Sequence, residues 1–211
     1  MYPSVEVRWF YKGKMPTKVL KDYIQGGDEP TQFSPRTDYY FAIPGRVDLG
    51  IKLREGLLEI KQRTKSHNVF QFNPHTFGIV EYWQKWSFAL DQPDTGPGIN
   101  KIISKNDPWT AVVKQRWLRK YKITQDGHAF EVSQSVNIVN GCEWELSKVH
   151  LDGIGSPWWS IAFEAFGDDY RWMDNLKAAV EMAFTTIGDQ KFLPSDSLSY
   201  PAWLNLVRKG M

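Results

Sequence analysis

Basic side chains recur at alternate positions in three separate stretches of the chain. The pairs are Lys52 and Arg54, Lys61 and Arg63, and Lys114 and Arg116. In an extended strand, residues two apart point to the same side, so each pair would present two cations on one face. The planar fork of Arg and the point charge of Lys both suit phosphate oxygens. Neighbouring cations repel one another unless an anion offsets them, so the pattern indicates a site for a polyanion.

Carboxylates follow the same alternation. Glu6 stands two residues before Arg8, while Glu143, Glu145 and Ser147 share one strand face. For a single strand, a charged face opposite an apolar one is ordinarily explained by solvent exposure. Because the pattern recurs in five strands, the alternative is a closed barrel with its charged faces inward and its apolar faces covered by helices.

Such faces exist only if these stretches form strands. Polar and apolar residues alternate along much of the sequence, with the period of two that is typical of strands. Strand-like stretches span residues 4–11, 36–43, 50–63, 77–90, 109–123, 128–139, 142–151 and 157–167. The stretch at 50–63 is expected to be a hairpin around a Glu-Gly turn, and 91–108 to be a long loop, with a lid as one alternative. About eight strands are therefore expected.

Helices are expected in two places. A short one begins near Pro16 and ends at Gly26, and an amphipathic one spans about 170–188. The tail, 189–211, is expected to be irregular, with a last helical turn near 203–209. We therefore predict a single α+β domain over residues 1–211. Its strands, at about 4–167, would close an eight-stranded antiparallel β-barrel with flanking helices.

Composition limits the classes of function. The 211 residues are 42% hydrophobic, which predicts a folded globule. Lys and Arg number 26 against 24 Asp and Glu, so the chain lacks the basic excess of a protein that wraps duplex nucleic acid. The single Cys142 predicts a buried, unreactive thiol and suits the cytoplasm. No stretch of about 18 apolar residues and no signal segment is apparent, so we expect no membrane partner and no export.

The ordered motifs resemble those of the CYTH superfamily, the triphosphate tunnel proteins that include inorganic triphosphatases, thiamine triphosphatase and class IV adenylate cyclases. The stretch "SVEVR" at 4–8 stands where the family has E-x-E-x-K on its first strand. The stretches "TDYYFAIPG", "LGIKLREG" and "LEIKQR" are similar to its tyrosine-rich, basic and lysine strands. "KQR" at 114–116, "EWELSKV" at 143–149 and "IAFEAFG" at 161–167 resemble its later basic strand and two acidic strands. The resemblance runs from residue 4 to about 167 in the family's order.

The resemblance implies a triphosphate held inside the barrel by basic residues, with one or two Mg²⁺ or Mn²⁺ ions held by carboxylates. The phosphate-binding residues carried over are Arg8, Lys52, Arg54, Lys61, Lys114 and Arg116, with Arg63 added by strand parity and Arg119 as a looser addition. The metal-binding residues carried over are Glu6, Glu145 and Glu164. In such a site the metal neutralises phosphate charge and orients water, while the cations stabilise the leaving phosphate.

Three acidic positions of the family pattern hold other residues here. They are Ser4, Ser147 and Ala162. The basic side is intact, whereas the carboxylates for a second ion are reduced. Two functions follow: metal-dependent hydrolysis of a triphosphate, or binding of a polyphosphorylated small molecule without efficient catalysis. A third alternative is a barrel that binds an unrelated ligand, such as an apolar molecule among the ten Trp residues.

Overall fold

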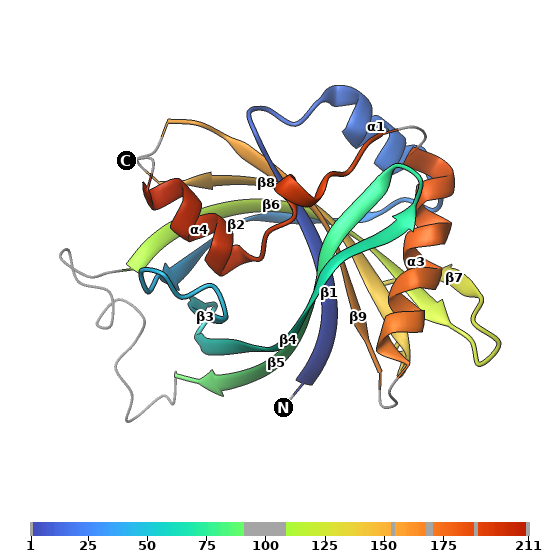
Figure 1. Ribbon diagram of the computed structural model, residues 1–211, viewed down its shortest axis with the longest axis horizontal. Helices are drawn as coiled ribbons and strands as arrows, with labels where there is room; N and C mark the ends of the chain where they lie inside the picture. Colours follow the sequence, from blue (N-terminus) through green and yellow to red (C-terminus); the bar gives the residue numbers. More distant parts are fainter. Residues whose placement is uncertain (1, 91–108, 153–154, 168–170, 188–189, 210–211) are drawn as a thin grey trace.

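The expected barrel is present. The computed structural model describes residues 2–90, 109–152, 155–167, 171–187 and 190–209. These residues form a closed, eight-stranded antiparallel β-barrel with one additional strand and three α-helices (Figure 1). The α+β barrel with flanking helices is thus confirmed. The loop expected at 91–108 lies outside the described residues.

The ring is closed by a pairing between strands distant in sequence. Its strands are β1 (Tyr2–Lys12), β2 (Thr31–Phe41), β3 (Leu49–Arg54), β4 (Leu57–Asn73), β5 (Thr76–Ala89), β6 (Trp109–Ile123), β8 (Gly141–Leu151) and β9 (Trp158–Phe166). They follow the order β2-β3-β4-β5-β1-β9-β8-β6, and β6 pairs again with β2. The short β7 (Ala129–Val132) pairs with β6 and lies outside this ring.

Apolar side chains on the outer face of the barrel lie beneath two helices. Helices α1 (Thr17–Gln25) and α3 (Trp172–Ile187) lie together along one flank (Figure 1). Trp144 of β8 is fully buried in the cluster that these helices cover. Because Glu143 and Glu145 alternate with Trp144 along the strand, burial of the Trp on the outside turns both carboxylates inward.

The tail contains a full helix where an irregular segment with one helical turn was expected. A 3₁₀ turn at Pro194–Asp196 is followed by α4 (Tyr200–Lys209). Pro201 is compatible with this helix because it occupies the first turn, where its missing N–H is not needed. Trp203 and Leu204 of α4 are 0% and 2% exposed, so burial against the barrel stabilises the helix.

Three strands also differ in their bounds from the sequence prediction. β2 spans Thr31–Phe41, where a strand at 36–43 was expected. β4 continues well past residue 63 and pairs with β5 as far as Asn73 and Thr76, with register shifts along the way. Of the strand expected at 128–139, only Ala129–Val132 forms. Ser and Asn interrupt the later part of that stretch, and these residues favour turns over strands.

Two further observations concern the cysteine and the helices. Cys142 is buried, as predicted, and this burial raises the pKa of its thiol. Among the described residues, no helix is both long and apolar enough to cross a bilayer.

Candidate functional site

The barrel encloses a cavity of about 770 Å³. Eight basic residues line it: Arg8, Arg36, Lys52, Arg54, Lys61, Lys85, Lys114 and Arg116. Five carboxylates also line it: Glu6, Glu59, Glu143, Glu145 and Glu164. Cations therefore outnumber carboxylates on the cavity wall.

Most of the residues proposed from the sequence meet in this cavity, and two do not line it. Arg63 bonds to Glu81 beyond the cavity lining. Arg119 lies on the outer face, where its guanidinium donates to the backbone oxygens of Tyr23 and Ile24 and pairs with Glu131. Arg119 therefore links α1 to the barrel, and the inward position expected for it is wrong.

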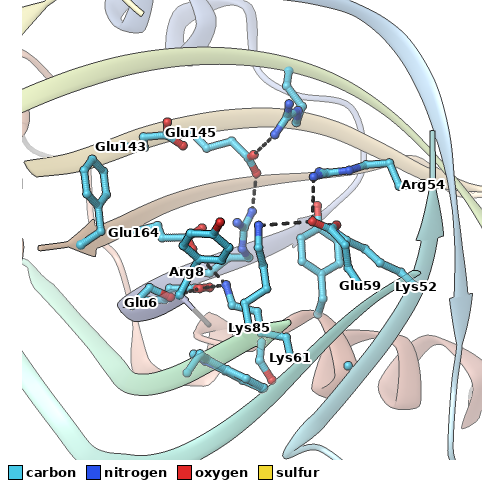
Figure 2. Close-up of a pocket in the computed structure, with 18 of the residues that line it drawn as sticks. Glu6, Arg8, Lys52, Arg54, Glu59, Lys61, Lys85, Glu143, Glu145 and Glu164 are labelled. Atoms are coloured by element: carbon cyan, nitrogen blue, oxygen red, sulfur yellow. Dashed lines mark hydrogen bonds and ion pairs between the residues drawn. The ribbon is translucent and has the colours of Figure 1, made fainter. Parts of the chain in front are cut away.

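Three cations share one carboxylate on the side of the barrel formed by β3, β4 and β5. Glu59 is 2% exposed, and its carboxylate lies 2.9 Å from Lys52, 3.0 Å from Arg54 and 3.2 Å from Lys85. Burial opposes the ionisation of Glu59, but the three cations lower its pKa to about 2. We call these four residues the Glu59 cluster. Figure 2 shows it on one side of the cavity, with Glu143 and Glu164 on the other.

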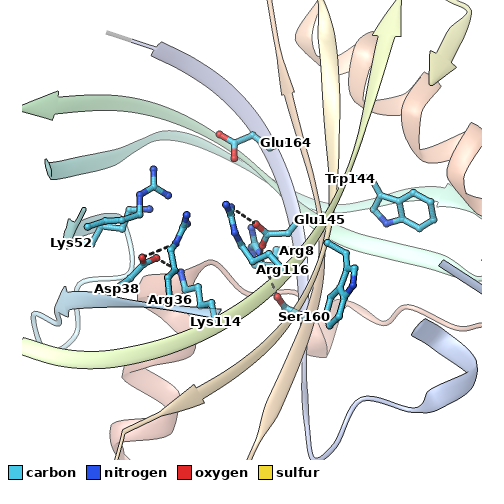
Figure 3. A network of polar contacts seen from close by, with 12 residues as sticks. Arg8, Arg36, Asp38, Lys52, Lys114, Arg116, Trp144, Glu145, Ser160 and Glu164 are labelled. Atoms are coloured by element: carbon cyan, nitrogen blue, oxygen red, sulfur yellow. Dashed lines mark hydrogen bonds and ion pairs between the residues drawn. The ribbon is translucent and has the colours of Figure 1, made fainter. Parts of the chain in front are cut away.

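Further along the barrel, two arginines bind Glu145. Nη1 of Arg8 lies 2.6 Å from one carboxylate oxygen of Glu145, and Nη1 of Arg116 lies 3.1 Å from the other (Figure 3). Although burial alone would raise the pKa of Glu145, the two arginines hold it well below its usual value. Both oxygens of this carboxylate are thus engaged by cations.

A second buried ion pair lies beside this group. Asp38 is fully buried; it forms an ion pair with Lys114 at 2.9 Å and accepts a hydrogen bond from Arg36 at 3.1 Å (Figure 3). Burial lowers the pKa of Lys114, against the opposing effect of Asp38. Nζ of Lys114 also lies 3.8 Å from the ring centre of Tyr200, and the guanidinium of Arg8 lies 4.7 Å from the same ring. Such contacts favour retention of both positive charges.

Three carboxylates stand in one row across β1, β9 and β8. The strand registers place Glu6 opposite Glu164, and Glu164 opposite Glu143. Lys61 bonds to Glu6 and lies 3.1 Å from Glu164, which offsets part of their repulsion. Among the described residues, Glu143 has no ion pair. Burial, and then Glu164 and Glu145, raise the pKa of Glu143 to about 7.

No protein-family model matches this chain, and no curated protein matches its sequence.

The carboxylates named as metal ligands do not form a ligand set in this arrangement. Glu145 is bound by two arginines, while Glu6 and Glu164 share Lys61. Within the described part of the chain, no three His, Cys, Asp or Glu side chains are grouped so that they could hold an ion. A divalent ion would have to displace Lys61 to reach both Glu6 and Glu164.

Sequence reasoning missed four cavity residues that matter. Lys85 and Arg36 carry cations, Glu59 organises three of them, and Tyr200 contacts two. Alternation could have identified Lys85, which follows Glu81 and Trp83 at steps of two on β5. No local pattern marks Tyr200, because it enters the site through the packing of the tail.

Proposed function

We propose that this chain is a divergent relative of the triphosphate tunnel proteins and binds a linear triphosphate, or a similar polyphosphorylated small molecule, inside its barrel in the cytoplasm. The Glu59 cluster carries the proposal. Three cations around a single buried carboxylate leave positive charge unneutralised in an enclosed space. A ligand with several phosphate groups supplies the missing charge and accepts several charge-assisted hydrogen bonds at once.

The rest of the wall supports a ligand with more than one phosphate. Cations come from six strands: β1, β2, β3, β4, β5 and β6. A single phosphate could contact only part of this set, whereas a triphosphate presents oxygens to several strands. The cavity volume of about 770 Å³ falls within the range of small-molecule sites.

The direct test is calorimetry of inorganic triphosphate binding, without added metal, to the native protein and to Lys61→Met. Lys61 faces the cavity, and its loss also leaves Glu6 and Glu164 to repel an anion. We expect Kd to rise by about tenfold to a hundredfold, as is typical for loss of a hydrogen bond to a charged group.

The matched control is Lys21→Met, which removes the same charge from the exposed surface of α1. Its Kd should stay within about twofold of the native value, since exposed charges act weakly on a distant ligand. A triphosphate that does not bind, or that binds Lys61→Met as tightly as the native protein, would contradict the proposal. Thermal unfolding of each variant confirms that it is folded.

Hydrolysis is the second candidate, and the row of three glutamates favours it. Glu6, Glu164 and Glu143 face one cavity from adjacent strands, where they would lie close to a bound phosphate chain. The test is phosphate release from triphosphate and from ATP with Mg²⁺ or Mn²⁺. Release that Glu6→Gln abolishes supports a metal-dependent triphosphatase. Tight binding without turnover under either metal leaves a binding protein.

A further inference from the structure

The C-terminal helix α4 closes one end of the barrel from within. Phe10 follows Arg8 by two residues on β1, Val112 precedes Lys114 by two on β6, and Val149 follows Glu145 by four on β8. Even spacing along a strand keeps side chains on the same face, so these apolar residues point inward like the charged ones. They form one buried cluster with Trp203 and Leu204 of α4.

Packing at this end is dense and aromatic. The ring of Trp203 stacks on Phe10 at 4.8 Å with an interplanar angle of 4°, and Trp158 contacts it edge-on at 6.0 Å. Phe10 and Trp203 are 3% and 0% exposed. Tyr200, at the start of α4, stacks on Tyr40 at 5.5 Å, and both residues line the cavity. Together these rings form a floor beneath the charged part of the barrel.

The other end of the cavity reaches the surface. Tyr2 and Val139 both line the cavity, yet they are 67% and 59% exposed. Tyr2 is paired with Lys85 across β1 and β5, which places one cation of the Glu59 cluster near this mouth. Arg8 and Lys114 contact the floor through Tyr200. Cations therefore extend from the mouth to the floor.

We infer that the barrel receives a linear polyphosphate end-first through the mouth beside Tyr2 and Val139, so that its ligands are molecules with a free terminal phosphate. The inference rests on the proposed function. A chain longer than the cavity keeps its remainder outside, because the floor blocks passage through the barrel. A terminal phosphate also carries more negative charge than an internal one, which suits the desolvated cations at the floor. A closed phosphate ring has no end to insert.

The test compares three ligands by calorimetry and sedimentation. They are linear triphosphate, a linear polyphosphate of several tens of phosphates, and cyclic tetrametaphosphate, whose charge is close to that of triphosphate near neutral pH. We expect two protein molecules per long chain, one at each end, whatever the chain length. We also expect Kd per chain end to stay within a few-fold of that for triphosphate, and the cyclic ligand to bind at least tenfold more weakly.

The inference and the proposed function fail in different ways. If triphosphate binds but the number of proteins bound grows with chain length, end-first binding is overturned while the anion site stands. A cyclic ligand that binds as tightly as triphosphate has the same consequence. If triphosphate does not bind, the proposed function falls, and this inference falls with it. The Lys61→Met variant should lower binding at the ends of long chains as it does for triphosphate, whereas binding that it leaves unchanged would point to the outer surface and overturn the inference.

Discussion

The carboxylate of Glu59 lies among three cations, Lys52, Arg54 and Lys85, that would otherwise be free to bind the proposed anion. Its three partners are held in position by ion pairs to one buried carboxylate, and Arg54 also donates a hydrogen bond to it, which limits their movement before any anion arrives. The same carboxylate competes with that anion for the same donors. We therefore expect Glu59 to stabilise the fold and to reduce affinity for an anion at the same time.

Replacement of Glu59 separates these two effects. In Glu59→Gln, three partly buried cations lose the counter-charge of a buried carboxylate, and we expect the free energy of unfolding to fall by about 3 kcal/mol, as when one partner of a buried ion pair is removed. Triphosphate should bind more tightly, by about tenfold, because a competing negative charge is gone. Urea unfolding and calorimetry measure the two quantities. The control is Ser87→Ala, which removes only a 3.5 Å contact to Glu59. Weaker binding by Glu59→Gln would show that the carboxylate positions the cations more than it competes.

Glu143 makes stability depend on pH. Its pKa is raised to about 7 in the folded state from an ordinary value near 4.5. Between these values the folded protein binds more protons than the unfolded chain, so stability falls as the pH rises through this window. Glu143→Gln should remove that slope and raise the free energy of unfolding at pH 8 by about 2 kcal/mol. Urea unfolding at pH 5 and pH 8 is the measurement. If Glu143→Gln left the dependence of the free energy of unfolding on pH unchanged, ionisation of Glu143 would not destabilise the folded state.

The same substitution gives a test of the anion site. Above pH 7, ionised Glu143 adds a negative charge to the cavity, so Glu143→Gln should bind triphosphate more tightly than the native protein at pH 8. At pH 6 the native carboxyl is largely protonated, and the two proteins should bind alike. The two proteins are compared at the same pH, so the protonation state of triphosphate is the same for both and does not affect the ratio of their affinities. A ratio of affinities that does not vary with pH would contradict this role.

At the scale of elements, strand faces could be predicted and the tail could not. Alternation identifies which side of a strand is charged, and barrel closure then brings Arg8, Lys52 and Arg116 together. The position of Arg63 depends on its bond to Glu81, which alternation does not reveal. Helix α4 has little intrinsic signal, since its stability comes from Trp203 fitting into the barrel end. Such tertiary packing is not encoded in a local pattern.

Helix α4 should therefore depend on its buried aromatic side chain. We expect Trp203→Ala to lower the free energy of unfolding by about 3–5 kcal/mol, because it leaves a cavity where a fully buried ring packed. Leu206→Ala on the same helix is the control, since Leu206 is 51% exposed and should cost less than about 0.5 kcal/mol. Denaturant unfolding measures both variants. If both substitutions lowered the free energy of unfolding equally, α4 would not pack in the barrel end as described.

At the scale of the whole molecule, an anion inside the barrel should stabilise every strand that contributes a ligand. A ligand that binds only the folded state adds about 2.7 kcal/mol at a hundred times its Kd. For a chain of this size we expect Tm to rise by about 5–10 °C with triphosphate. Scanning calorimetry measures the shift, with sodium chloride at matched ionic strength as the control. An equal shift in both solutions would indicate general screening and no specific site.

The place of β1 in the ring affects how the protein is made. β1 precedes every other strand of the barrel in the sequence, yet it pairs with both β5 and β9. Until β9 has emerged, one edge of β1 has no partner, and the β2 to β6 pairing alone cannot complete the ring. Barrel closure must therefore wait until β9 has been translated, and α4 follows β9 in the sequence, so it can enter the barrel end only after that. A nascent chain with unpaired strand edges is prone to aggregation, so we expect its yield in cells to depend on chaperones that hold it during synthesis.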